Sequence, residues 1–253
     1  MTKYKNKLYH DLKELGVKEG DVLMVHSSLR SVGSFINKPQ IIVEVLKKVL
    51  GPSGTLLMPA LTYENVGPSQ PVFDEKQTPS CVGALTEYFR ELPDTLRSIH
   101  PTHSVCAVGE NSRALLDKHY LDNTPCGPNS PFTKLKENNG KILFMGCGLQ
   151  PNTLMHGIEE LIQPEYLFDN TTEYTIITNS KSIYKKKYIN HGFKGFKQRY
   201  DRILDVLEKE DYSSGKILQA NSYLIPSEII WEKVYKKLRM DSLYFIDRNS
   251  TNR

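Results

Sequence analysis

The sequence lacks the short patterns by which several large classes of protein are recognised. It contains no GxGxxG and no GxxxxGK[ST], so dinucleotide and P-loop nucleotide sites are unsupported. The absence of GxSxG disfavours a serine hydrolase of the nucleophile-elbow type. No apolar run approaches the ~20 residues that cross a bilayer, and no apolar run follows the charged first residues as in a secretory signal. These absences predict a cytoplasmic protein without a membrane partner.

Cysteine is scarce, and it never occurs in the paired spacing of metal sites. The four cysteines are far apart without a CxxC pair, which argues against a zinc ribbon or a thioredoxin-type site. Cys106 and Cys147 stand inside apolar segments and are expected in the core. The formal net charge of +4 suits a small anionic ligand better than nucleic acid, which usually requires a denser basic face.

The 253 residues, of which 39% are apolar, alternate apolar strand-like runs with helix-length segments. This alternation predicts an α/β fold, a layered mixed sheet flanked by helices. Strands are expected at residues 21–26, 54–60, 104–108, 141–147 and 216–220. Helices are expected at residues 8–15, 39–50, 82–91, 112–118, 131–136, 200–209 and 226–238. No low-complexity linker interrupts the chain, so we expect one domain over 1–253, with 166–253 elaborating a core of 1–165.

Two polar segments flank these strands. His26 and the serines after it follow the first strand, where open α/β sheets bind ligands, although a plain serine-rich turn explains them equally well. His100 and His103 lie within five residues before the third strand. In an extended segment, side chains three apart point to opposite faces, so hydrogen bonding is favoured there over a zinc site.

The third polar segment pairs a histidine with a carboxylate. His156 and Glu159 are three residues apart on a predicted helix that Asn152 or Thr153 could cap, so both side chains lie on one face. A carboxylate beside an imidazole orients the ring and raises its basicity, as a general base requires. A surface ion pair is the alternative interpretation of this spacing.

Six segments occur in an order that resembles the aminoglycoside 3-N-acetyltransferase family, which is distinct from the GNAT acetyltransferases. They read VHSSLRSVG, GTLLMPALTY, FDEKQTPSCVGALTEYFR, RSIHPTHSVCAVG, SPFTKL and KILFMGCGLQPNTLMHGIEE, and span residues 25–160. Near the C-terminal end, DSLYF at 241–245 is similar to the closing motif of the family. Because the match is colinear over nearly the whole chain, it is far more specific than any one motif.

The resemblance implies an enzyme that transfers acetyl from acetyl-CoA directly to an amine, without a metal. It implies that His156 is the general base and that Glu159 orients it. The oxyanion needs hydrogen-bond donors, and our hypothesis for these is Thr153 with nearby backbone N–H groups. Acceptor contacts are expected from Asp74, Glu87 and His191. The residues expected to contact the coenzyme are Ser27, Ser28, Leu29, Val32, Thr102, His103, Ser104, Val105, Ser130, Pro131 and Phe132.

The chain departs from the resemblance in its acceptor half. Family members that act on polycationic aminoglycosides tend to line this part with carboxylates, whereas here it carries Lys185, Lys186 and Lys187. If these lysines face the pocket, a nucleotide-linked amino sugar of surface polysaccharide synthesis is the better acceptor, and if they face solvent this preference disappears. The basic, aromatic-rich stretch 181–200 otherwise indicates a solvated hairpin, an anion-facing lid or a nucleic-acid-binding module. A metallohydrolase using His100, His103, His156 and a carboxylate is the remaining alternative enzyme class.

For the oligomeric state we expect a homodimer, because it is the commonest oligomer.

Overall fold

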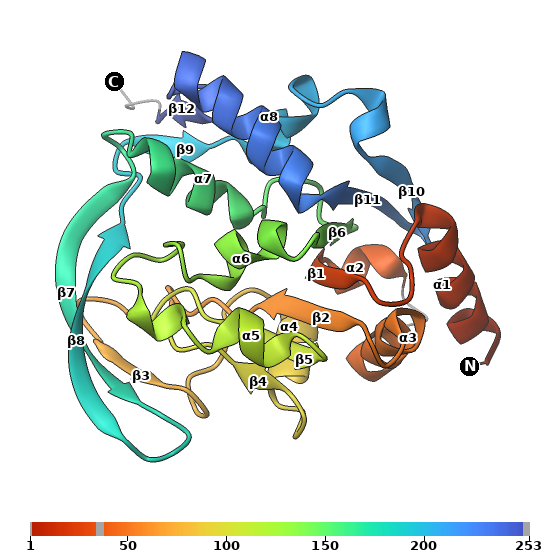
Figure 1. The fold of residues 1–253 in the computed structure, drawn as a ribbon, viewed down its shortest axis with the longest axis horizontal. Helices are drawn as coiled ribbons and strands as arrows, with labels where there is room; N and C mark the ends of the chain where they lie inside the picture. The colour runs from red at the N-terminus through yellow and green to blue at the C-terminus, as the bar shows by residue number, and fades with distance from the viewer. Residues whose placement is uncertain (1, 34–37, 250–253) are drawn as a thin grey trace.

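The computed structural model describes residues 2–33 and 38–249, which build a layered α/β fold around a seven-stranded mixed sheet (Figure 1). The strand order is β10-β11-β6-β1-β2-β5-β4. At the centre β1 runs parallel to β2 and to β6, while the outer pairings are antiparallel. The strands of this sheet are β1 (Val22–Ser27), β2 (Thr55–Pro59), β4 (Leu96–Arg97), β5 (Val105–Gly109), β6 (Lys141–Met145), β10 (Ser213–Ile217) and β11 (Ala220–Pro226).

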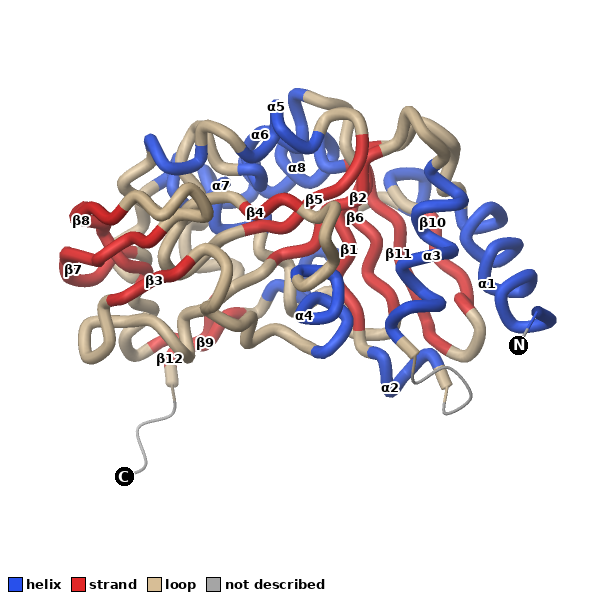
Figure 2. The backbone as a smooth tube through the Cα atoms, turned by 90° about the horizontal axis from the view of Figure 1, so that it is seen from below, coloured by secondary structure: helices blue, strands red, loops and turns tan. Residues whose placement is uncertain are grey.

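Helices cover both faces of the main sheet because its central strands are apolar on both sides. In β1, Leu23 and Val25 join one core cluster and Val22 and Met24 join the other, as the two-residue period of a strand requires. The first cluster is covered by α1 (Thr2–Leu15), α3 (Pro39–Leu50) and α4 (Ala84–Arg90). The second is covered by α5 (Ser112–Leu116), α6 (Pro131–Glu137), α7 (Leu154–Ile162) and α8 (Ser227–Met240), which lie together along one side in Figure 2.

Smaller sheets lie at the end of the molecule opposite α1 (Figures 1 and 2). One combines β3 (Val72–Asp74), β7 (Phe168–Ile177) and β8 (Ile183–His191), and the other pairs β9 (Phe196–Gln198) with β12 (Ile246–Arg248). Short helices complete the fold: α2 (Leu29–Val32), η2 (His119–Leu121), η3 (Tyr200–Asp205) and η4 (Lys209–Asp211). The last residue of β8, His191, is thereby brought back towards α7.

The fold class predicted from the sequence is confirmed, and the helix predicted at 39–50 has those bounds. The helix predicted over 200–209 begins at Tyr200 but is a 3-10 helix that already ends at Asp205. The single strand predicted at 216–220 is instead the turn of a hairpin, because Leu218 adopts a φ of 55° and reverses the chain between β10 and β11. None of the helices within 2–33 and 38–249 is long and apolar enough to cross a membrane.

Candidate active site

A pocket of about 390 Å³ opens at the carboxyl ends of two parallel strands, where open α/β sheets bind ligands. Ser27 at the end of β1 and Pro59 at the end of β2 form part of its wall. The opposite wall consists of the loop 150–153 and the first turn of α7, with His156. The pocket therefore joins the strand ends to the segment that carries the predicted base.

His156 and Glu159 form the expected pair on α7. His156 Nδ1 lies 3.0 Å from Glu159 Oε2, and the Glu159 side chain is fully buried. His156 lines the pocket and its Nε2 has no hydrogen-bond partner in the part of the chain that the structure describes. When Nδ1 donates its proton to the carboxylate, Nε2 presents a lone pair to the pocket, which is the arrangement that a general base needs.

Two tyrosines hold Glu159 in place, and sequence reasoning did not identify either. Tyr166 donates its hydroxyl to Glu159 Oε1 at 2.8 Å, and Tyr200 donates to Oε2 at 2.6 Å. Burial, reinforced by the neighbouring Glu159, raises the pKa of Tyr200 well above its usual value, so its hydroxyl remains a donor. Tyr200 is 41 positions from Glu159, and no local spacing signals such a contact.

A second imidazole–carboxylate pair faces the same pocket. His191 Nε2 lies 2.8 Å from Glu160 Oε1, and Glu160 also accepts hydrogen bonds from Thr124 Oγ1 and the Cys126 backbone N–H. Burial raises the pKa of Glu160 to about 7, although these hydrogen bonds oppose the shift. Burial also lowers the pKa of His191 well below its usual value, with a smaller contribution from nearby His156. Both shifts favour the uncharged form of the group concerned.

Three of the pocket's side chains keep buried polar atoms that have no hydrogen-bond partner in the described part of the chain: His26 Nε2, both amide atoms of Asn152, and His191 Nδ1. Burial lowers the pKa of His26 to about 3, so this ring is neutral at physiological pH. An unsatisfied buried polar group costs about 1–3 kcal/mol, and such groups are rare unless a ligand or water completes them. Their convergence on one cavity marks it as a binding site for a ligand with polar groups.

The structure brings some of the residues predicted for the coenzyme to this pocket. Ser27, His103 and Thr153 line it, and Thr102 lies directly behind His103 with its Oγ1 2.9 Å from His103 Nδ1. Thr153 occupies the N-cap position of α7, but its side chain accepts no capping hydrogen bond and Asn152 does not cap either.

The other residues predicted to contact the coenzyme are not part of the pocket wall. Ser28 precedes α2, which contains Leu29 and the buried Val32. Ser104 accepts from buried Arg97, and Val105 begins β5. Ser130 caps α6 by accepting the Phe132 N–H, and Pro131 and Phe132 are buried in its first turn. None of these residues lines the pocket.

Asp74 and Glu87, predicted to lie near the acceptor, do not line the pocket either. Asp74 Oδ1 accepts the backbone N–H groups of Lys76 and Gln77 and so holds its own turn. Glu87 forms a bidentate pair with Arg90 at 2.6 and 2.9 Å. Both carboxylates therefore have local hydrogen-bond partners, and these contacts account for the two residues without an acceptor.

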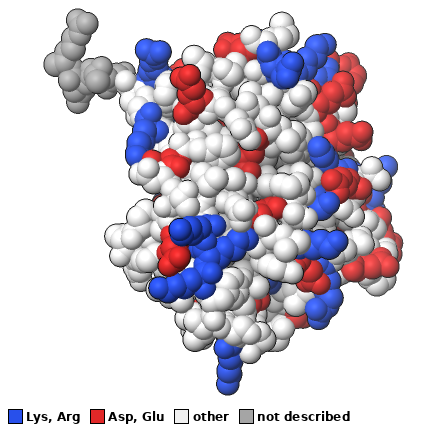
Figure 3. Space-filling model, turned by 60° about the vertical axis from the view of Figure 1, so that its left-hand side comes forward, with Lys and Arg blue, Asp and Glu red and all other residues white. Residues whose placement is uncertain are grey.

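The lysines of β8 do not face the pocket. Lys185 and Lys187 are exposed, and Lys186 donates to the carbonyl oxygens of Tyr120 and Asp122. In Figure 3, in which this side of the molecule comes forward, most of the surface is uncharged, and basic and acidic side chains lie next to one another in several places. Among the described residues that line the pocket there is no lysine, so like-charge repulsion gives no reason to prefer a phosphorylated acceptor.

Because the two exposed lysines point to solvent, their removal is expected to leave acceptor selectivity unchanged. The double variant Lys185→Ala/Lys187→Ala should keep kcat/KM within about twofold of wild type for a cationic and for a phosphorylated amine, since exposed charges contribute little. Steady-state kinetics with one acceptor of each kind checks this. A selective loss of the phosphorylated acceptor would show instead that the hairpin folds over the site.

Comparison with known proteins identifies the family. The family model described as aminoglycoside 3-N-acetyltransferase matches residues 24–239. Aminoglycoside N(3)-acetyltransferase IV from a Salmonella species is 31% identical, over 96% of this chain and 90% of that protein. A crystal structure of a histidine-to-alanine variant of AAC(3)-IVa in complex with gentamicin is 29% identical with a TM-score of 0.81, over 95% of this chain and 90% of the other. AAC-IIIb as a binary complex with CoASH is 28% identical with a TM-score of 0.79, over 93% and 96% of the two chains. The chain therefore belongs to the aminoglycoside 3-N-acetyltransferase family.

Proposed function

We propose that the protein is an acetyl-CoA-dependent N-acetyltransferase that acetylates an amine of an aminoglycoside or a related amino sugar, with His156 as the general base. The observation that carries this proposal is the buried His156–Glu159 pair, whose free Nε2 faces the pocket at the strand ends. Relatives named as aminoglycoside N(3)-acetyltransferases and a similar structure that contains CoASH support the choice of the two substrates.

Acetyl transfer to an amine needs a proton acceptor, because an alkylammonium ion has no lone pair with which to attack. His156 Nε2 takes the proton of the ammonium or of the attacking amine. The new N–C bond forms first and places negative charge on the carbonyl oxygen of the thioester. When this oxyanion collapses, the C–S bond breaks and its electron pair leaves on the coenzyme thiolate. His156 then returns the proton to the thiolate. Glu159, held by Tyr166 and Tyr200, keeps the imidazole in one orientation through both steps.

The cysteines of the chain do not favour a route through an acyl-enzyme. Burial raises the pKa of Cys106 and of Cys147 to about 12, and it raises the pKa values of Cys81 and Cys126 as well. Thiols with such pKa values stay protonated at neutral pH, and the thiolate is the nucleophile. Direct attack by the amine on the thioester is therefore the proposed route.

Donors for the oxyanion, or for the amides of the pantetheine arm, come from the loop before α7. Asn152 is 1% exposed, its amide has no hydrogen-bond partner among the described residues, and Thr153 beside it lines the same pocket. Hydrogen-bond donors already fixed in a site that excludes water stabilise developing negative charge better than water does. We assign this role to Thr153 and Asn152.

Asn152→Ala is expected to lower kcat/KM about tenfold, because one ligand hydrogen bond is lost in a buried site. Its stability should equal or exceed that of wild type, since an unsatisfied buried amide disappears. Steady-state kinetics and thermal unfolding on the same preparation check both parts. Unchanged kcat/KM together with a lowered Tm would mean that Asn152 serves folding alone.

The central experiment follows thiol release from acetyl-CoA against a panel of aminoglycosides and amino sugars. We expect turnover with at least one aminoglycoside and a product heavier by one acetyl group, with the 3-amine as the site. Absence of coenzyme release with every amine would contradict the proposal. Turnover confined to nucleotide-linked amino sugars would support the alternative acceptor.

A further inference from the structure

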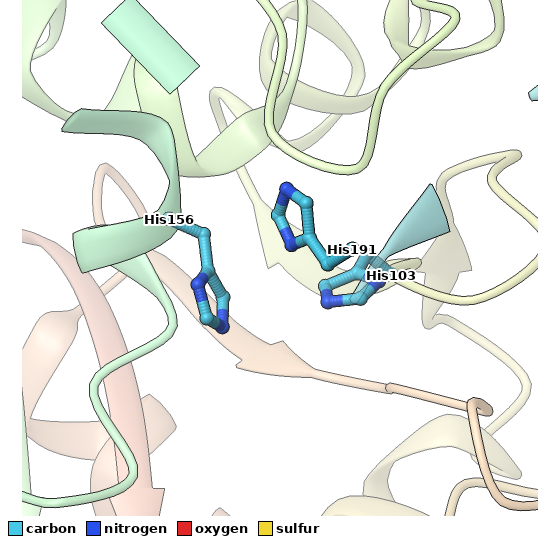
Figure 4. A group of neighbouring side chains, drawn as sticks. All are labelled: His103, His156 and His191. Carbon is cyan, nitrogen blue, oxygen red and sulfur yellow. The ribbon is translucent and has the colours of Figure 1, made fainter. Parts of the chain in front are cut away.

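Three histidines from distant parts of the chain lie close together (Figure 4), and all three line the pocket. His103 comes from the loop before β5, His156 from α7 and His191 from the end of β8. One ring nitrogen of each lies within 4.8 Å of one nitrogen of each of the others. The rings lie close together, with centroid separations of 4.9 Å for His156–His191 and 5.4 Å for His103–His191.

Each of these rings has its other nitrogen held from outside the cluster. His156 Nδ1 contacts Glu159 at 3.0 Å, His191 Nε2 contacts Glu160 at 2.8 Å, and His103 Nδ1 contacts Thr102 Oγ1 at 2.9 Å. Histidines that bind metals typically hold their second nitrogen in this way, with a carboxylate or another oxygen that fixes the ring and raises its basicity. The histidine cluster thus has its supporting partners in place.

The inward-facing nitrogens lack such partners. His191 Nδ1 is buried and has no hydrogen bond, and neither His103 Nε2 nor His156 Nε2 has one within residues 2–33 and 38–249. When the outer nitrogens donate to oxygen, the inner ones are all lone-pair acceptors, and they cannot satisfy one another. The position between them suits a species that interacts with lone pairs: water or an ammonium group, which donate hydrogen bonds, or a metal cation, which accepts the lone pairs directly.

We propose that His103, His156 and His191 form a binding site for a divalent transition metal ion of the Zn²⁺ class, and that metal bound there inhibits acetyl transfer. Imidazole nitrogen suits Zn²⁺ and Co²⁺, and three protein ligands leave the fourth tetrahedral position open to water in the pocket. Zn–N bonds of about 2.0–2.1 Å in a tetrahedron place the ligand atoms about 3.3 Å apart. Here the three nitrogens lie within 4.8 Å of one another, so each pair needs to approach by at most about 1.5 Å.

The inhibitory effect rests on the function proposed above, whereas the metal binding does not. Metal on His156 Nε2 occupies the lone pair that would accept the amine's proton. The same ion displaces the ammonium group of the acceptor from the histidine cluster. Inhibition is therefore expected to be competitive with the amine and to require no contact with the coenzyme.

Metal binding is tested on the full-length protein after treatment with EDTA and dialysis. Titration with Co²⁺ should produce the intense visible bands of a tetrahedral site at one equivalent, and Zn²⁺ should abolish them. His103→Ala and His191→Ala should each weaken Zn²⁺ binding, measured calorimetrically, at least about tenfold. His191→Gln, which keeps an amide donor for Glu160, repeats the test should the alanine variant unfold.

The matched control is His10→Ala. His10, Asp11 and Glu14 on α1 are the other described group that could hold a metal, and His10 and Glu14 are exposed. Unchanged Co²⁺ bands in this variant support the histidine cluster. Their loss in His10→Ala, their survival in both His103→Ala and His191→Ala, or their absence from the wild type would overturn the proposal.

The inhibitory part has its own measurement. Acetylation is followed by mass spectrometry with free Zn²⁺ fixed by a metal buffer, because the released coenzyme thiol itself binds zinc. We expect a rise in apparent KM for the amine at unchanged KM for acetyl-CoA. Stoichiometric metal binding without inhibition would refute the inhibitory role, and an inactive protein that still binds Co²⁺ would place the failure in the proposed function alone.

Discussion

Replacing His156 with alanine is expected to lower kcat for acetyl transfer about 1000-fold. The variant loses the α7 side chain whose free nitrogen faces the pocket, and a positioned general base contributes roughly 10²–10⁴-fold. Residual turnover should remain, because bringing the two substrates together does not depend on the imidazole. Endpoint or continuous assays of thiol release at saturating acetyl-CoA measure the change in kcat.

Two controls separate loss of the base from loss of the fold. His10→Ala removes an exposed histidine distant in sequence and should retain full activity. Added imidazole should partly restore His156→Ala, because the truncated side chain leaves space in a pocket that is open to solvent. Activity of His156→Ala within about tenfold of wild type, with unchanged circular dichroism, would rule out the assigned role.

The second large effect is expected at Glu159, where glutamine should lower kcat about 100-fold with little change in KM. A carboxylate can only accept a hydrogen bond from His156 Nδ1–H. The amide NH2 of glutamine can instead donate a hydrogen bond to Nδ1, and the ring proton is then on Nε2. That tautomer has no lone pair towards the pocket. An analogous change from carboxylate to amide in the serine-protease triad acts through the same wrong tautomer.

Glutamine is a suitable replacement because its amide oxygen can still accept a hydroxyl from Tyr166 or Tyr200. Tyr200→Phe is the matched comparison, since it removes a hydroxyl that donates to Glu159 and lies 2.9 Å from His156 Nδ1, while the carboxylate that accepts from Nδ1 stays in place. About a fivefold loss of kcat is expected. A Glu159→Gln enzyme as active as Tyr200→Phe would show that the carboxylate merely packs against the ring. Thermal unfolding of both variants detects any contribution of the buried hydroxyls to stability.

The local part of the site was predictable from the sequence. Residues three apart on a helix share a face whatever surrounds the helix, so the His156–Glu159 pair could be inferred from spacing once the segment was recognised as helical. The alternation of apolar strand-like runs with helix-length segments predicted the layered fold, and the proline and glycine at its ends predicted the bounds of α3.

Contacts between distant segments were not predictable, because they depend on register and packing. Whether Lys185, Lys186 and Lys187 face a pocket is set by which side of β8 each residue occupies and by the loop that supplies carbonyls to Lys186. The same holds for Tyr166 and Tyr200 on Glu159, and for the partners of Asp74 and Glu87.

The sequence by itself thus determined the α/β class, the family and the imidazole–carboxylate pair, since all three follow from local periodicity or a colinear set of motifs. Only the tertiary structure decided that His103 and His191 join His156, that the lysines point away, and that Asn152 keeps an unpaired amide in the pocket. The reason is physical: a side chain's environment is made by strands and loops that are distant in the sequence, whose approach no local pattern records.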